Sequence, residues 1–174
     1  MVRKFLVSAL MLLGASSAFA DKVSSPAHHF SADFPGQATQ AADEDNATDA
    51  SGNVISKIST FQDVGPGRYM AIIMVDTYLS PYSVTPSVYM KKHVAEFADG
   101  IKGTATSQDT TFEGNPAIQF TFASPSLTLS GEGRIVYVGT EKPVGYMMIA
   151  GRMANATADD TAKLDAFMKS FDIN

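Results

Sequence analysis

The side chains best suited to acid–base catalysis in this sequence are its three histidines, because imidazole gains and loses a proton near neutral pH. No cysteine is present, which excludes a catalytic thiol. Nucleophilic hydrolysis requires a serine activated by a histidine and an acid, and no Gly-x-Ser-x-Gly motif marks such a serine. His93 lies one turn before Phe97 in a pattern of helical spacing, which predicts a half-buried or surface histidine rather than a base. We therefore expect no catalytic residue. A histidine beside a carboxylate in a deep pocket would be needed to support a hydrolase.

The adjacent residues His28 and His29 are the candidate for a histidine metal site. Neighbouring residues on a strand point to opposite faces, so both imidazoles do not readily reach one ion. One of them, together with Asp33 or Asp45, would offer an imidazole and a carboxylate to a divalent cation. The prediction is that there is no metal site, with binding at His28 left open.

An acidic segment at residues 43–49 offers carboxylates of the kind that bind calcium. The EF-hand pattern fails there, since the sixth position of a loop starting at Asp43 is Thr48 instead of glycine, and no glutamate closes the loop. Together with residues 49–53, the segment predicts a solvated hairpin loop whose like charges repel. Whether this loop binds a metal is also left open.

Aromatic residues cluster around the segment before the first predicted helix, namely Tyr78, Tyr82 and Tyr89. Tyrosines in a loop suit recognition of a partner or ligand. The same residues could instead pack the loop against the core. They are the first set of candidate contacts.

Three arginines at or near predicted strand ends, Arg68, Arg134 and Arg152, form the second set of candidate contacts. Guanidinium groups that converge can bind an anionic ligand. Surface salt bridges to the abundant carboxylates explain these arginines equally well. Both interpretations stay open.

The elements that must position these residues are mostly strands. Apolar residues that alternate or run continuously between Gly, Pro, Asn and Asp predict them. The expected strands are residues 30–34, 37–41, 54–62, 68–77, 104–112, 117–123, 134–138 and 145–150. The strands at 104–112 and 117–123 should form a hairpin through Glu113-Gly114-Asn115-Pro116.

Two helices are predicted from their capping residues. Thr85 can act as the N-cap of the first, with Pro86 at its first position and Gly100 as a left-handed stop. Thr157 and Asp160 have the spacing of a capping box for the second. Apolar residues follow with helical spacing: Met90, Val94, Phe97 and Ile101 in the first helix, and Leu164, Phe167, Met168 and Phe171 in the second.

This order of elements indicates an α+β fold, an antiparallel sheet flanked by helices, because strands outnumber helices and most connect as hairpins. One helix can cover each face of the sheet. Residues 21–27 are polar and serine-rich and predict a flexible N-terminal arm. Residues 28–174 then form a single domain, which is long enough to build its own core.

The first 20 residues have the three parts of a secretory signal peptide. Arg3 and Lys4 supply the positive start, residues 5–13 are apolar, and Ala18-Phe19-Ala20 is a small-x-small cleavage site. Cleavage between Ala20 and Asp21 predicts export, to the periplasm in a Gram-negative cell and otherwise to the medium. Asp21 stands where a lipoprotein needs cysteine, so we expect no lipid anchor, and no later segment is apolar enough for a membrane span.

The net charge of the processed chain restricts the classes of partner that it can bind. Removal of Arg3 and Lys4 lowers the Lys and Arg count from 13 to 11 against 18 Asp and Glu, which leaves a net charge of −7. A surface of this sign argues against nucleic acid and anionic membranes as partners. Without cysteine, the fold must be stable without disulfides.

Four features in order resemble the PsbP-like fold, the family of the photosystem II extrinsic protein PsbP and of the nuclear import factor that binds the GTPase Ran. They are an opening aromatic strand with Phe34-Pro35, a capped mid-chain helix, a Gly114-Asn115-Pro116-Ala117 hairpin, and a closing helix that ends at Phe171. The resemblance covers most of residues 30–173. Within this group, the chain is similar to the small exported bacterial relatives of PsbP. The resemblance implies an α/β/α sandwich and a role in binding or assembly, and it carries over no functional residue.

The sequence therefore predicts an exported, non-enzymatic binding or accessory domain without a cofactor. Its partner would be an envelope or extracellular protein or a small apolar ligand. A small-ligand or metal carrier is the alternative, followed by a hydrolase. Oligomeric state is not determined at this level.

Overall fold

The computed structural model describes residues 21–41, 45–79 and 84–174. The predicted signal peptide and Tyr82 lie outside these residues. Most of the described chain forms one 8-stranded sheet in which all paired strands are antiparallel. In spatial order its strands are β3 (Thr39–Gln40), β5 (Val54–Gly65), β6 (Tyr69–Tyr78), β10 (Val144–Met153), β9 (Leu129–Val138), β8 (Asn115–Ser124) and β7 (Thr104–Phe112), with β4 (Asp45–Thr48) also paired to β5.

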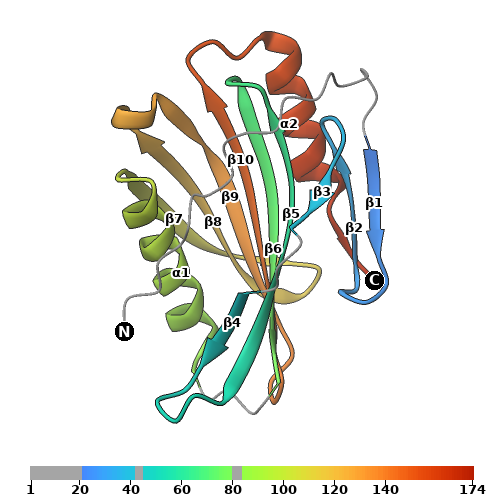
Figure 1. Cartoon of the computed structure of the whole chain (residues 1–174), viewed down its shortest axis with the longest axis vertical. Helices are drawn as coiled ribbons and strands as arrows, with labels where there is room; N and C mark the ends of the chain where they lie inside the picture. The colour runs from blue at the N-terminus through green and yellow to red at the C-terminus, as the bar shows by residue number, and fades with distance from the viewer. Residues whose placement is uncertain (1–20, 42–44, 80–83) are drawn as a thin grey trace.

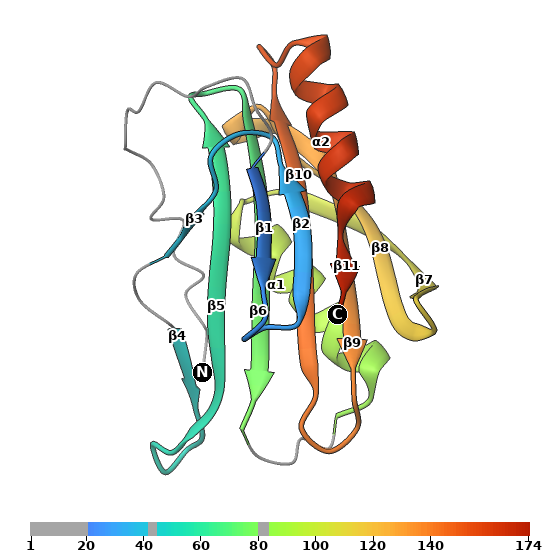
Figure 2. The same cartoon turned by 90° about the vertical axis from the view of Figure 1, so that its right-hand side faces the viewer.

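The remaining elements cover this sheet. Two helices, α1 (Pro86–Gly100) and α2 (Ala158–Ser170), lie on opposite faces (Figure 1). A 3-stranded sheet made of β1 (Asp21–Ser25), β2 (Phe30–Phe34) and β11 (Asp172–Ile173) lies beside α2, and a short 3₁₀ helix, η1 (Pro125–Leu127), joins β8 to β9. Figure 2 shows β1, β2 and α2 in front of the strands β5, β6 and β10. The predicted α+β sandwich is confirmed.

Each face of the large sheet has its own core. On the α2 side, Phe30, Phe34 and Phe167 are fully buried against β6 and β10. On the α1 side, Phe97 of the helix packs edge-on against Phe122, with ring centroids 4.9 Å apart. The apolar stripes predicted for both helices are buried as expected, and removing these side chains from water stabilises the fold.

The hairpin of β7 and β8 is tighter than predicted. Glu113 and Gly114 both have positive φ, 49° and 79°, and alone form the turn, while Asn115 and Pro116 begin β8. Glycine favours this conformation, which matches the twist of the two strands. Pro116 is tolerated because pairing of β8 with β9 starts one residue later, at Ala117.

The prediction of a flexible arm at residues 21–27 is wrong for its first five residues. Asp21–Ser25 form β1, which pairs with β2 from Asp21 opposite Phe34 to Ser25 opposite Phe30. The side chains of β1 are mostly exposed, so its composition carries no strand signal. Backbone hydrogen bonds to β2 and the packing of Val23 on the core hold it in place.

The acidic segment is also more ordered than predicted. Residues Asp45–Thr48 form strand β4 along β5, and Ala47 is buried. The turn starts only at Asp49, whose carboxylate accepts hydrogen bonds from the backbone N–H of Ser51 at 2.8 Å and of Asn53 at 2.9 Å. Pairing with a neighbouring strand overrides the weak strand propensity of Asp, Asn and Ala here.

Both ends of α1 differ in detail from the prediction. Thr85 occupies the N-cap, but its side chain makes no capping hydrogen bond. The helix ends at Gly100, and the left-handed residue is Lys102, with φ 50°. Glycine is required at 103 instead, since a Cβ there would lie 2.3 Å from the carbonyl oxygen of Ala123 on β8.

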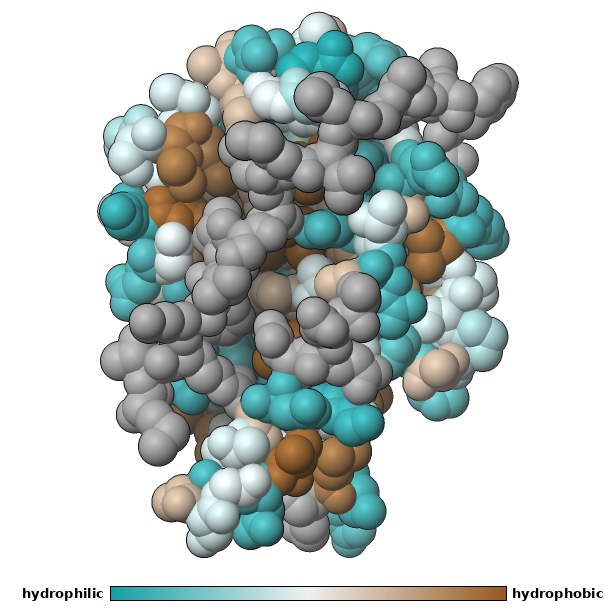
Figure 3. All heavy atoms as spheres, viewed as in Figure 1, coloured by the Kyte–Doolittle hydropathy of each residue, from teal (hydrophilic) through white to brown (hydrophobic). Residues whose placement is uncertain are grey.

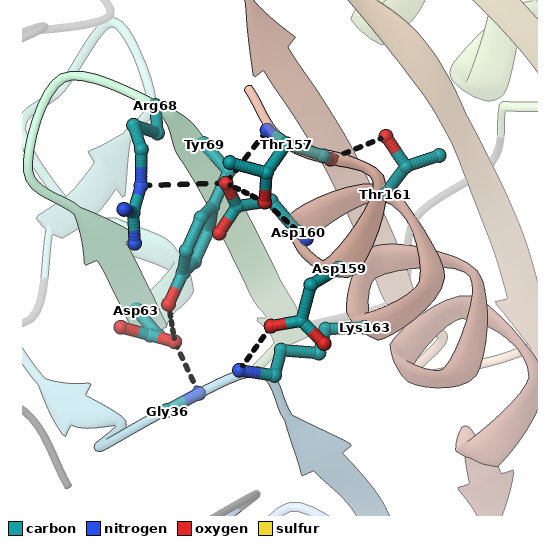
Figure 4. Close-up of polar contacts among 9 residues, drawn as sticks. All are labelled: Gly36, Asp63, Arg68, Tyr69, Thr157, Asp159, Asp160, Thr161 and Lys163. Carbon is teal, nitrogen blue, oxygen red and sulfur yellow. Dashed lines mark hydrogen bonds and ion pairs between the residues drawn. The ribbon is translucent and has the colours of Figure 1, made fainter. Parts of the chain in front are cut away.

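The capping box predicted for α2 is confirmed and extended by an arginine (Figure 4). The Thr157 hydroxyl accepts from the Asp160 N–H at 3.1 Å, and the Asp160 carboxylate accepts from the Thr157 N–H at 2.9 Å. Arg68, in the turn just before β6, places its Nε 3.3 Å from the same carboxylate. The buried Asp160 thereby ties the start of α2 to the sheet.

Asp160→Asn should lower the free energy of unfolding at pH 7 by about 1–2 kcal/mol, because charge-assisted hydrogen bonds are lost. Burial by itself would raise the pKa of Asp160, but the bonds from Thr157 and the charge of Arg68 outweigh it and hold the pKa below 3.8. The stabilisation is therefore complete above about pH 4 and disappears as the pH falls through the folded-state pKa. Chemical denaturation of both proteins between pH 7 and 2.5 measures this difference.

Asp63 is the control of opposite sign. Burial raises the pKa of its carboxyl, even though Tyr69 and the Gly36 N–H donate to it at 3.0 and 2.6 Å. The folded state binds this proton more tightly than the unfolded state, so the wild type should gain stability relative to Asp63→Asn as the pH falls toward 4. A gap for Asp160→Asn that does not change with pH would contradict the assignment.

Candidate functional site

Three buried polar residues and the half-buried Glu96 gather between α1 and β6, in a group that we call the His93 cluster: Asp76, Tyr89, His93 and Glu96. Asp76, Tyr89 and His93 are each less than 8% exposed, at 6%, 3% and 7%. The Tyr89 hydroxyl donates to the Asp76 carboxylate at 3.2 Å, and the His93 Nε2 lies 3.9 Å from the same oxygen. The His93 Nδ1 lies 3.3 Å from a Glu96 carboxylate oxygen. The prediction of a half-buried or surface His93 is therefore wrong.

Helical spacing and a glycine build this cluster. Tyr89, His93 and Glu96 are one turn apart along α1, so they share the face that meets the sheet. Across from them, Gly145 of β10 is paired with Asp76, and a Cβ on Gly145 would lie 2.1 Å from the Tyr89 hydroxyl oxygen. The tyrosine can reach Asp76 because β10 has no side chain at this position. His93 was singled out in the sequence, but its partner Asp76 lies in an apolar strand and gave no signal.

The geometry of the cluster does not suit a chelated metal. The Asp76 carboxylate faces the Nε2 of His93, and the Glu96 carboxylate faces the Nδ1 on the other side of the ring. A single metal ion bound to one of these nitrogens therefore could not also bind both carboxylates. Within the described residues, no group of three or more His, Asp or Glu is arranged to hold a metal ion. What the arrangement can do is share a proton across the 3.3 Å contact between the His93 Nδ1 and the Glu96 carboxylate.

The space beside the cluster is too small for a substrate. The cavity measures about 20 Å³, and its lining includes Asp76, Tyr89, His93 and Gly145. That volume accommodates roughly one water molecule. Ligand pockets are typically about 300–1,000 Å³. The histidine and carboxylates expected of a hydrolase are close together, but the deep pocket that such an enzyme needs is not formed here.

Two of the three candidate tyrosines are packed inside the protein. Tyr78 and Tyr89 are 4% and 3% exposed, and their rings meet edge-on with centroids 6.1 Å apart. Tyr89 also packs against Tyr137 of β9 at 5.1 Å. This placement favours the interpretation that the tyrosines secure the loop. A contact with a partner through them stays a prediction.

Of the three candidate arginines, Arg68 and Arg152 lie on neighbouring strands near the start of α2, and Arg134 lies apart from them. Arg68 is engaged by Asp160. The exposed Arg152 lines an open hollow of about 520 Å³ between the β8–β9 connection and the start of α2. Arg134 lies opposite Met148 of β10, and Met148 is four residues before Arg152 on that strand. The backbone positions of Arg134 and Arg152 are therefore roughly 13 Å apart along the strand direction. The Arg134 guanidinium lies 4.7 Å from the Phe112 ring centre, and burial lowers its pKa.

The candidate metal residues near the N-terminus also have structural roles. The His28 ring packs edge-on against Phe61 at 5.6 Å, and its carbonyl accepts a hydrogen bond from the Tyr146 hydroxyl at 2.9 Å. His29 is exposed in the turn, with φ 54°. Residues 42–44 of the acidic segment lie outside the described residues.

A different feature, missed from the sequence, is an apolar surface on the α1 side of β5 and β6. We call it the open apolar face; it comprises Ile58, Val64, Met70, Ile72 and Met74, which are half-buried except for Val64 at 36% exposure. Because α1 packs mainly on β7, β8 and β9, it reaches these two strands only at the His93 cluster, beside Ile58 and Met74. No helix among the described residues covers the rest of the face. Figure 3 faces the β5 edge of the molecule, and hydrophobic residues reach the surface there in separate places between polar ones.

Diagonally opposite lies a polar counterpart, the open polar face, on the α2 side of β7 and β8. Its residues are exposed and uncharged: Thr104, Thr106, Gln108, Thr110, Gln119 and Thr121. In Figure 2 the hairpin end of these two strands extends beyond α2 and β11, with no described segment in front of it. The alternation of polar and apolar residues was visible in the sequence, but not which strands would stay uncovered.

Comparison with known proteins places the chain in the PsbP-like fold. It matches the solution structure of cyanobacterial PsbP (CyanoP) from Synechocystis sp. PCC 6803 with a TM-score of 0.53 over 94% of this chain and 98% of that chain. The two sequences are 8% identical, so the likeness concerns the fold alone. No protein-family model matches the chain, and no curated protein does.

The helices in the described residues are not candidates for crossing a bilayer. None combines the length and the apolar character that a membrane span requires.

Gly145→Ala tests whether the His93 cluster depends on the missing side chain of β10. The new methyl group would overlap the Tyr89 hydroxyl, so Tyr89 must move and lose its bond to Asp76. We expect a loss of about 1–3 kcal/mol in the free energy of unfolding. Thermal and urea denaturation measure it. Gly100→Ala, at the exposed end of α1, is the control and should change stability little; equal effects of the two substitutions would contradict the prediction.

Proposed function

We propose that this chain is an exported, non-enzymatic binding or accessory domain that binds a protein partner through the open apolar face. One observation carries this proposal: half of the α1 side of the central sheet has apolar side chains and, beyond the His93 cluster, no helix over it in the described residues. A sheet normally buries its apolar face against another element. Met70 and Met74 add flexible, polarisable side chains, which adapt to varied apolar surfaces.

A protein partner fits this face better than a small ligand. Small molecules are bound in concave pockets that bury most of their surface. The cavity next to the open apolar face measures about 20 Å³, whereas the face itself is spread over two neighbouring strands. A protein surface needs no enclosure, since it excludes water by covering the face.

The charge of this chain also restricts the surface that its partner can have. The open apolar face contains no ionisable residue, and Thr60 and Gln62 lie between its members on β5. The net charge of −7 after processing would repel an acidic partner at long range. We therefore expect a partner with an apolar patch and a neutral or basic rim.

The hollow beside Arg152 supports a small-ligand carrier as the second candidate. Its volume of about 520 Å³ lies in the range of ligand pockets, and Arg152 with Ser130 and Thr128 would suit a small anion. It ranks below the first candidate because it is open to solvent and its polar side chains are exposed.

Substitutions on the open apolar face should abolish partner binding without unfolding the protein. Val64→Glu places a charge at its most exposed residue, and Ile72→Thr keeps the β-branched shape while removing apolar surface. Each should weaken binding at least about tenfold, because a charge or hydroxyl is desolvated on contact. Binding would be measured between the purified protein and a partner first captured by cross-linking in its native compartment.

Thr121→Glu, on the open polar face, is the matched control and should bind like the wild type. Thermal unfolding would verify that all three variants are folded. A partner that binds Val64→Glu and Ile72→Thr with unchanged affinity would exclude the open apolar face.

Export has a separate test. The full-length sequence expressed in a Gram-negative host should yield a periplasmic protein that begins at Asp21, as read by N-terminal sequencing or intact mass. Replacing Ala18 and Ala20 by bulky residues should leave the unprocessed chain with the membrane fraction, since only small side chains fit the signal peptidase. A cytoplasmic product that keeps Met1 would contradict export.

A further inference from the structure

The two edges of the large sheet are built differently. At one edge, β3 has 2 residues, β4 has 4, and the pairing of β4 with β5 is interrupted between Ala47 and Thr48. Short strands and irregular pairing are common ways to prevent a sheet edge from pairing with another chain. At the other edge, β7 is 9 residues long and pairs with β8 without interruption from Thr104 to Phe112.

Within the part of the chain that the structure describes, the β7 edge lacks the usual protection against pairing. Its sequence contains no proline or lysine, and its single charged residue is Asp109. Lys91 of α1 lies 3.3 Å from that carboxylate, so the charge is balanced within the same chain. Apart from Ala105 and Phe112, the side chains along β7 are exposed.

The hairpin geometry identifies the backbone groups that face outward. In a hairpin with a two-residue turn, the flanking residues exchange both hydrogen bonds, and bonded pairs then alternate along the strands. Because Glu113 and Gly114 form the turn, Phe112, Thr110, Gln108, Thr106 and Thr104 bond to β8. The N–H and C=O groups of Ala105, Ser107, Asp109 and Thr111 therefore point away from the sheet.

We propose that β7 pairs in antiparallel fashion with β7 of a second copy of this chain, centred on Gln108. In this register the whole strand is used, Ala105 of one copy lies opposite Thr111 of the other, and Ser107 lies opposite Asp109. The Ser107 hydroxyl can donate to the facing carboxylate. A shift by one residue toward the turn would place Asp109 opposite Asp109, which is unfavourable.

The position of α1 makes a second copy the fitting partner. The two-fold axis of such a pair is perpendicular to the sheet, so both copies of α1 lie on the same side of the joined sheets. Strands are about 4.8 Å apart and α1 packs over β7 and β8, which puts the two helix axes roughly 10–14 Å apart. Side chains can bridge that distance. The exposed Val88 and Ala95, in line with Lys91 along α1, lie on the side that faces this edge.

This interface is separate from the open apolar face, and it stands or falls independently of the proposed function. The pairing also extends the open polar face across the two-fold axis, since Thr106 of one copy meets Thr110 of the other. Thr–Thr pairs across antiparallel strands are favourable. The result is one continuous sheet with a paired helix layer on one side.

Oligomeric state measured by analytical ultracentrifugation of the purified protein tests the proposal. The wild type should show a concentration-dependent monomer–dimer equilibrium. Ser107→Pro removes an outward N–H and leaves the bonds of β7 to β8 intact, so it should weaken the dimer at least about tenfold. Far-UV circular dichroism verifies that the variant is folded.

A charge exchange at Gln108 tests the register and does not depend on proline being tolerated. Gln108→Lys and Gln108→Glu each place like charges opposite each other, so each should be monomeric at concentrations where the wild type is dimeric. An equimolar mixture should form the heterodimer, which native mass spectrometry resolves. Gln119→Lys, on the neighbouring strand of the same face, is the matched control and should dimerise like the wild type.

A wild type that stays monomeric at millimolar concentration would overturn the proposal. So would a dimer that persists in Ser107→Pro and in both Gln108 variants, because it would use another surface. Failure of the mixture to associate, with both single variants monomeric, would overturn the register centred on Gln108.

Discussion

Burial of both faces of one long antiparallel sheet by two helices and one small sheet, among the described residues, is the constraint on which the rest of this structure depends. Neither helix is wide enough for a whole face, so α1 packs over β7, β8 and β9 while α2 and the β1–β2–β11 sheet cover β5, β6 and β10 from the other side. The packing is diagonal, and it leaves one uncovered quarter on each side. The side chains follow this division: the quarter beside α1 is apolar, and the quarter beside α2 carries threonine and glutamine.

One buried carboxylate joins each helix to the sheet. Asp160 accepts hydrogen bonds from Thr157 and lies beside Arg68 at the start of α2, and Asp76 accepts a hydrogen bond from Tyr89 of α1. Buried carboxylates are costly unless they are paired or hydrogen-bonded, so these contacts specify how each helix lies on its strands. The His93 cluster therefore has a structural explanation that requires no catalysis, in keeping with a cavity that holds about one water molecule.

The surfaces left over by this packing are where a partner can bind. A face that is apolar and uncovered gains stability when another molecule covers it, and a bare strand edge gains hydrogen bonds when another strand pairs with it. The two features lie at different places on the molecule, at β5–β6 and at β7. A chain of this fold could thus bind a partner and a second copy of itself at the same time.

The sequence by itself determined the long strands of the central sheet, the two helices and the capping box of Thr157 and Asp160, because apolar periodicity and capping are local properties. It also indicated the PsbP-like fold from the order of these elements. It could not show that residues 21–25 form a strand, since β1 is held by backbone bonds to β2 and not by its own side chains. Nor could it place His93 beside Asp76, bury Tyr78 or separate Arg134 from Arg68 and Arg152, because these depend on which distant strands become neighbours. Only the tertiary structure decided which quarters of the sheet stay uncovered, since coverage is set by where two helices come to rest on eight strands.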